Sequence, residues 1–179
     1  ITSKNGSLVY DGHWINIIDT PGHADFGGQV ERVLKMADGA LLLVDAEEGP
    51  MPQTYFVLKK ALAQHLPIIV VVNKIDKPAS RPDWVVDQVF DLFVKLHAPD
   101  DILDFPVVFA SSRLGYALDD PNDTGNDLIP LCDKIITHVP PPSGNPDASL
   151  QMLVSSIDYS PYLGRLGIGK ITAGALNIN

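Results

Sequence analysis

The chain has 179 residues, of which 45% are hydrophobic and 20% charged, and its formal net charge at pH 7 is −9. This length allows a sizeable core in one domain or slightly more. The acidic balance is opposite to that of a typical nucleic-acid binder, and a single cysteine excludes an internal disulfide. Because it has no signal peptide and no apolar run near the ~18 residues of a membrane span, the sequence predicts a cytoplasmic protein without a membrane partner.

The first expected element is a β-hairpin, in which residues 7–10 and 13–18 pair across an Asp11-Gly12 turn. The sequence Asp19-Thr20-Pro21-Gly22-His23 follows the second strand directly. A carboxylate at the C-terminal end of a strand suits a magnesium ion held through water. The Pro-Gly turn allows a backbone N–H to approach a phosphate closely, and His23 is placed to position a water against that phosphate.

Helices and strands are expected to alternate beyond this motif. The expected helices cover residues 27–36, 52–64, 82–96 and 127–138, the expected strands cover 40–45, 67–72 and 106–109, and 115–126 is expected to be a loop. This alternation predicts an α/β fold with a mostly parallel sheet and helices on both of its faces.

Asn73-Lys74-Ile75-Asp76 follows the apolar strand 67–72 and has the chemistry to recognise guanine. The Asp76 carboxylate can accept two parallel hydrogen bonds from the ring N–H and the exocyclic amine of that base. Adenine lacks this pair of donors and would leave the carboxylate unpaired. Asn73 can donate to the acceptor edge of the base, and the stem of Lys74 can lie along the ring.

Ser111-Ser112-Arg113 follows the strand 106–109, and its backbone N–H groups are in a position to reach the guanine carbonyl. Each motif has an ordinary interpretation when taken alone: Asp-Thr-Pro-Gly is often only a turn, Asn-Lys-x-Asp is more often than not a surface loop, and Ser-Ser-Arg by itself indicates almost nothing. Their occurrence in this order, each after an apolar strand, predicts a site for GTP or GDP with magnesium.

The three motifs resemble the guanine-recognition set of the P-loop GTPases. Residues 19–34 (DTPGHADFGGQVERVL), 49–54 (GPMPQT) and 81–96 (RPDWVVDQVFDLFVKL) are most similar to the BipA/TypA family of translational GTPases. Elongation factor G and LepA share the DTPGH motif and are the alternative, although the residues that follow it differ. The family usually has alanine where this chain has Ser112.

The resemblance implies that the parent protein is a translation factor that hydrolyses GTP and acts on the ribosome. Asp19 would bind magnesium through water, and Thr20, Pro21 and Gly22 would lie against the phosphates. The Gly22 N–H would contact the γ-phosphate. His23 would be the catalytic residue and would orient the attacking water.

The glycine-rich loop G-x-x-x-x-G-K-[ST], which cradles the phosphates in such enzymes, does not precede Asp19. Residues 164–170 fit the first part of the pattern, but Ile171 stands where a hydroxyl is required, and their glycines are expected at tight bends. We therefore expect a P-loop NTPase-type domain without its first strand, phosphate loop and first helix. The alternative to an active GTPase is a catalytically silent fragment that retains only the guanine pocket.

Loss of a central strand has a structural consequence, since its two neighbours lose a partner. We expect the strands at 13–18 and 40–45 to pair directly, unless another segment fills the gap. The proline-rich sequence at 140–146 marks a domain boundary. The expected organisation is a truncated GTP-binding domain at 1–139, a linker at 140–149 and the beginning of a β-barrel domain at 150–179.

Overall fold

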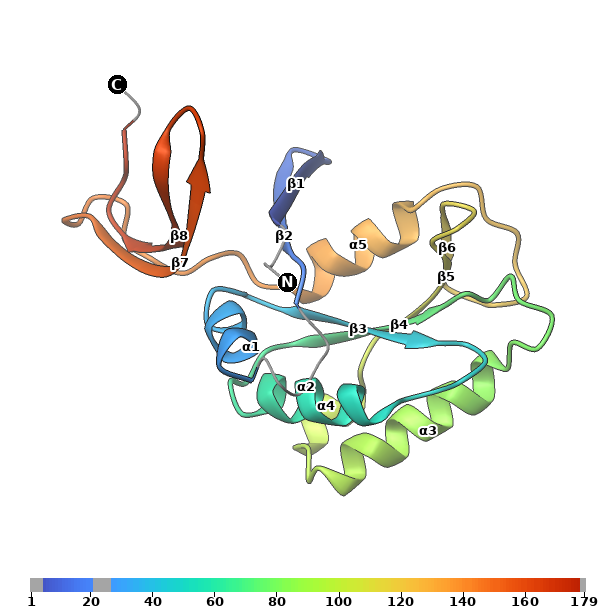
Figure 1. Cartoon of the computed structure of the whole chain (residues 1–179). Coiled ribbons are helices and arrows are strands. Elements are labelled where there is room, and N and C mark those ends of the chain that lie inside the picture. Colours follow the sequence, from blue (N-terminus) through green and yellow to red (C-terminus); the bar gives the residue numbers. More distant parts are fainter. Residues whose placement is uncertain (1–4, 21–26, 178–179) are drawn as a thin grey trace.

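The computed structural model describes residues 5–20 and 27–177 of the chain (Figure 1). Its centre is a four-stranded sheet in the order β3-β4-β5-β6. These strands are β3 (Ala40–Asp45), β4 (Ile68–Asn73), β5 (Val107–Ser111) and β6 (Tyr116–Leu118). The first three run parallel, as the sequence predicts, and β6 returns antiparallel to β5.

The expectation of a loop over 115–126 is wrong for its first residues, because β6 begins at Tyr116. Gly115 adopts a φ of 77°, which reverses the chain immediately after β5. Residues Tyr116 to Leu118 then find hydrogen-bond partners along the edge of β5.

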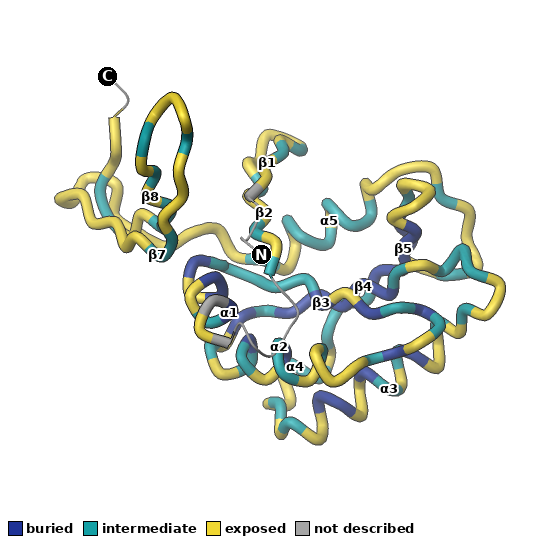
Figure 2. Tube along the Cα trace, in the orientation of Figure 1, coloured by how far each residue is buried: buried dark blue, intermediate teal, exposed yellow. Residues whose placement is uncertain are grey.

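Helices cover both faces of the sheet, and β4 is buried along nearly its whole length (Figure 2). In β4, Ile68, Val70 and Val72 enter the larger core, whereas Ile69 and Val71 enter the smaller core on the other face. Because both faces of β4 are buried, all of its residues up to Asn73 are apolar, and its sequence shows neither the two-residue alternation of a half-exposed strand nor a helical period.

The larger core contains α1 (Gly27–Leu34), α2 (Pro52–Leu62), α3 (Pro82–Lys95) and the short α4 (Asp100–Leu103), and the smaller core contains α5 (Ile129–His138). Prolines occupy the first turns of α2 and α3, as expected from their fixed φ. Phe93 of α3 is fully buried and its ring stacks on Phe105 at a centroid distance of 4.6 Å. Among the described residues, no helix has the length and apolar character needed to cross a membrane.

The predicted N-terminal hairpin is present and consists of β1 (Asn5–Tyr10) and β2 (His13–Ile18). Asp11 and Gly12 both have positive φ, as a tight two-residue hairpin turn requires. The prediction that this second strand pairs directly with the strand at 40–45 is wrong, since β1 and β2 form a sheet of their own. The tight turn at Asp11-Gly12 instead pairs β2 with β1 along its whole length, and the Tyr10 hydroxyl donates to Asp133 of α5 at 2.7 Å.

The edge of β3 that faces away from β4 has no strand paired with it among the described residues. Leu43, in the middle of β3, has 59% of its surface exposed. The β1–β2 hairpin does not fill this gap in the sheet, because all of its described ladder hydrogen bonds lie within the hairpin.

The C-terminal part of the chain is a second hairpin, formed by β7 (Gln151–Ser160) and β8 (Gly164–Ala173). The G-x-x-x-x-G-K sequence at 164–170 lies within β8, so it has no strand–loop–helix geometry and does not form a phosphate loop. Gly164 has a φ of 76° at the turn, and a Cβ on Gly169 would clash with the backbone of Leu153. These glycines therefore serve backbone bends and close approaches, as predicted.

Candidate functional site

The parallel register places the ends of three strands in one row. Asp45 of β3 lies opposite Asn73 of β4, which lies opposite Ala110 of β5. The polar segments that follow β4 and β5 are therefore neighbours in space, although more than 30 residues separate them in the sequence. Ligands of open α/β sheets bind outside such carboxyl ends.

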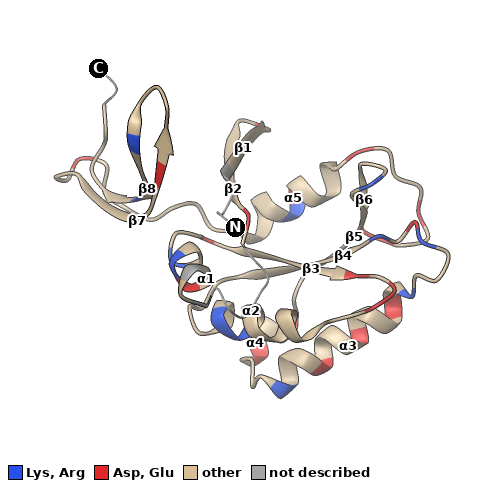
Figure 3. Ribbon diagram, viewed as in Figure 1, with Lys and Arg blue, Asp and Glu red and all other residues tan. Residues whose placement is uncertain are grey.

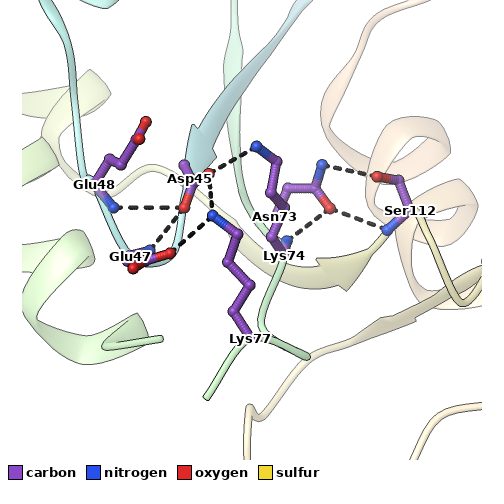
Figure 4. Close-up of polar contacts among 7 residues, drawn as sticks. All are labelled: Asp45, Glu47, Glu48, Asn73, Lys74, Lys77 and Ser112. Atoms are coloured by element: carbon purple, nitrogen blue, oxygen red, sulfur yellow. Dashed lines mark hydrogen bonds and ion pairs between the residues drawn. The ribbon is translucent and has the colours of Figure 1, made fainter. Parts of the chain in front are cut away.

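Asn73 joins the end of β4 to the loop after β5 (Figure 4). Its side-chain oxygen accepts hydrogen bonds from the backbone N–H of Lys74 at 2.8 Å and of Ser112 at 3.0 Å. Its amide nitrogen donates to the Ser112 hydroxyl at 2.9 Å. Ser112 thus supplies an acceptor for an amide hydrogen that is expected to face the base.

Asp76 is the most enclosed carboxylate of the site, with 9% of its side chain exposed. Its Oδ1 accepts a hydrogen bond from the hydroxyl of the fully buried Ser111 at 2.6 Å. Its Oδ2 accepts from Arg113, with Nε at 3.0 Å and Nη2 at 2.9 Å. The Ser111 hydroxyl, with help from Arg113, holds the pKa of Asp76 below its usual value although burial opposes this.

Lys74 pairs with Asp45, a carboxylate that lies outside the sequence motifs (Figure 4). Its Nζ lies 2.8 Å from Oδ2 of Asp45, and Nζ of Lys77 lies 3.2 Å from the same oxygen. The other oxygen of Asp45 accepts the backbone N–H of Glu47 at 2.8 Å. The only available signal was its place as the last residue of an apolar strand. Its cationic partners come from the loop after another strand and are visible only in the fold.

The residues predicted to act on the phosphates are only partly described by the structure. Asp19 and Thr20 directly follow β2, while Pro21, Gly22 and His23 lie outside the described residues. The structure therefore brings together Asn73, Lys74, Asp76, Ser111, Ser112 and Arg113, and leaves the arrangement of Asp19 to His23 as a prediction.

Within residues 5–20 and 27–177, no group of three His, Cys, Asp or Glu side chains is placed to hold a metal ion. Magnesium bound with nucleotides commonly takes one or two carboxylates and completes its shell with water and phosphates. Asp19 is exposed and could supply one such carboxylate.

A cavity of about 570 Å³ lies elsewhere, between α1 and β7, and is lined by residues such as Arg32, Met36 and Ile157. None of the residues at the ends of β4 and β5 lines it. The chemistry of the strand ends, with an enclosed carboxylate and a buried hydroxyl, makes them the better candidate for a specific site.

Comparison with known proteins matches residues 1–141 to the family described as Elongation factor Tu GTP binding domain. The chain is 54% identical over all 179 residues to proteins named Large ribosomal subunit assembly factor BipA from Salmonella typhimurium and Haemophilus influenzae. It spans only 30% and 29% of their lengths. These matches confirm the predicted resemblance to the BipA/TypA family.

A solved structure with a similar fold is that of translation elongation factor SelB from Methanococcus maripaludis in complex with the GTP analogue GppNHp. The TM-score is 0.71 at 22% identity, covering 96% of this chain and 36% of SelB. At that identity the likeness concerns the fold, and it agrees with the predicted P-loop GTPase type of α/β architecture. Sequence and structure together establish that this chain belongs to the elongation factor Tu GTP-binding domain family.

Proposed function

We propose that the segments after β4 and β5 form the pocket for the guanine base of GTP or GDP. The observation that carries this proposal is the carboxylate of Asp76, which is nearly enclosed and held by the buried Ser111 hydroxyl. Its lowered pKa keeps it ionised and therefore an acceptor only. A fixed acceptor of this kind matches the two adjacent donors of guanine and finds no such pair on adenine.

In the same proposal, the residues from Asp19 to His23 act on the phosphates in a full-length protein that contains this chain. The Gly22 N–H would contact the γ-phosphate, and His23 would orient the attacking water, so that their contribution is positioning. Asp19 would hold magnesium through water. When bound, that ion would offset the negative charge of the phosphates.

The proposed partner of such a protein is the ribosome, as the relatives' name, Large ribosomal subunit assembly factor, suggests. This would place the protein in the cytoplasm. With its net charge of −9, the chain would need local contacts to approach RNA. Acidic side chains follow one another along α3 (Figure 3), which makes that helix an unfavourable surface for RNA.

The alternative is a chain that binds the guanine base and hydrolyses nothing. It is favoured by residues 164–170, which match the first part of the phosphate-loop sequence but form part of strand β8. GTP turnover, measured on the 179-residue chain at saturating nucleotide, separates the two functions. Turnover above the uncatalysed rate would exclude the silent alternative.

The guanine pocket is tested by Asp76→Asn, which replaces one carboxylate oxygen by an amide donor. The affinity for fluorescent GDP is expected to fall about 10- to 100-fold, the effect of losing a hydrogen bond to a charged group. The affinity for the corresponding xanthine nucleotide should rise, because xanthine has a carbonyl in place of the exocyclic amine.

The control is Asp87→Asn, which makes the same change at an exposed position of α3 and should leave GDP binding unaltered. Equal GDP affinity of Asp76→Asn and the unmodified chain would contradict the proposed pocket. So would equal affinities of the unmodified chain for GDP and ADP.

A further inference from the structure

The guanidinium of Arg113 covers one oxygen of the carboxylate proposed to recognise guanine. Both Nε and Nη2 of Arg113 lie within 3.0 Å of the same atom, Oδ2 of Asp76. The Ser111 hydroxyl is bonded to the other oxygen, Oδ1. A carboxylate has about four acceptor sites, two on each oxygen. Both sites of Oδ2 are therefore used by Arg113, whereas Oδ1 keeps one site open beside Ser111.

A guanine base needs one acceptor on each carboxylate oxygen, because its ring N–H and exocyclic amine donate in parallel. Oδ1 can accept one of these donors without losing Ser111. Oδ2 cannot accept the other while both nitrogens of Arg113 are bonded to it. We infer that Arg113 competes with guanine for Oδ2 of Asp76 and sets the rate and affinity of base binding. This inference rests on the proposed function.

The burial of the three residues indicates which partner gives way. Ser111 is fully buried and its hydroxyl also accepts the backbone N–H of Leu114 at 3.2 Å, so it is fixed in place. Arg113 has 77% of its side chain exposed and can move into solvent without breaking the core. The Arg113–Asp76 pair also stabilises the site when no base is bound, because an enclosed carboxylate without a partner for Oδ2 would cost free energy.

The test is Arg113→Met, which keeps an unbranched stem of similar reach and removes the guanidinium. Exposed ion pairs are weak, so fluorescent GDP should associate about two- to five-fold faster and bind correspondingly tighter. Arg165→Met is the matched control, because Arg165 is exposed on β8 and lies outside the site, and it should change neither quantity. Unchanged or slower association of Arg113→Met would overturn the inference.

A second readout requires no nucleotide. The pKa of Asp76, followed by carboxyl carbon NMR, should rise in Arg113→Met because a cation near the carboxylate is removed. An unchanged pKa would show that the pair is absent and would also overturn the inference. If the unmodified chain and Arg113→Met both fail to bind any guanine nucleotide, the proposed function fails and the inference falls with it. GDP binding that is equal in both overturns the inference alone.

Discussion

Among the residues at the ends of β3, β4 and β5, Asp45 receives the most polar contacts. Two backbone amides and the ammonium groups of Lys74 and Lys77 share its carboxylate, of which 10% is exposed. Burial alone would raise the pKa of Asp45, but the hydrogen bonds from Lys74, the Glu47 N–H and Lys77 bring it well below its ordinary value.

The depressed pKa of Asp45 predicts a dependence of stability on acid. Because the folded pKa lies below the unfolded value of ~3.9, the contribution is fully present above that pH, and it is lost progressively as pH falls from there through the folded pKa. Asp45→Asn should lower the free energy of unfolding at pH 7 by about 1–3 kcal/mol. Urea unfolding at several pH values should then show that the free energy of unfolding falls less between pH 6 and pH 3 in Asp45→Asn than in the unmodified chain. Parallel pH profiles for both proteins would contradict the assignment.

At the scale of single residues, the sequence identifies the chemistry of Asp76 and Asn73 because both stand in a motif with fixed spacing. It could not identify the partners. Arg113 pairs with Asp76 across 36 intervening residues, and Lys74 pairs with Asp45 across 28. Which cation reaches which carboxylate depends on the side-chain positions at the ends of different strands.

Among the elements, the β1–β2 hairpin depends most on a tertiary contact. A two-stranded hairpin is marginal by itself, and Trp14 at its surface is 74% exposed. Its tie to the main body is the hydrogen bond from Tyr10 to Asp133 of α5. This bond and the negative charge of Asp133 disfavour the phenolate and raise the pKa of Tyr10 to about 12.

Asp133→Asn is expected to lower the pKa of Tyr10 toward 10, because the charge that disfavours the phenolate is removed. The change is measured by ultraviolet titration of tyrosine absorbance, as the difference between variant and unmodified chain. Asp158→Asn on β7 serves as the control and should leave the titration unchanged. A Tyr10 that titrates normally in the unmodified chain would mean that the hairpin is not held against α5.

Element types follow from the sequence where a pattern is long and continuous, as in β4 and α3. The pairing of β2 does not follow from its own residues. The alternation of apolar and polar residues in β2 fits any strand partner. Whether β2 pairs with β1 or with β3 depends on the turn at Asp11-Gly12 and on the contact with α5. Similarly, β6 is too short to leave a pattern and exists because the edge of β5 is available.

On the scale of the whole molecule, the two cores contain none of the described residues that follow Val139. The β7–β8 hairpin instead exposes large apolar side chains, such as Ile157 and Tyr159. It meets the rest of the chain through contacts with α1 and the ion pair between Lys170 and Asp38. The division into a GTP-binding domain, a linker and the beginning of a barrel stays a prediction.

Removal of residues 144–179 should therefore change the free energy of unfolding of the central sheet by less than about 1 kcal/mol, the value of a partly exposed ion pair. Chemical unfolding of residues 1–143, followed by circular dichroism, measures this change. A shortened chain that no longer unfolds cooperatively would show that the hairpin belongs to the same folding unit and would contradict the boundary.

The sequence by itself determined the family, the guanine motifs and the parallel sheet. Continuous apolar strands can be buried only between two layers of helices, and the polar residues that follow them then lie at one edge. The tertiary structure alone decided how the motif is completed. It paired Arg113 with Asp76, Lys74 with Asp45, and Ser112 with Asn73, and it separated β2 from β3. These outcomes depend on distances between segments remote in sequence, which no local pattern encodes. The DTPGH motif indicates the family. The competition between Arg113 and guanine for Asp76, in contrast, can be inferred only once the fold brings the strand ends together.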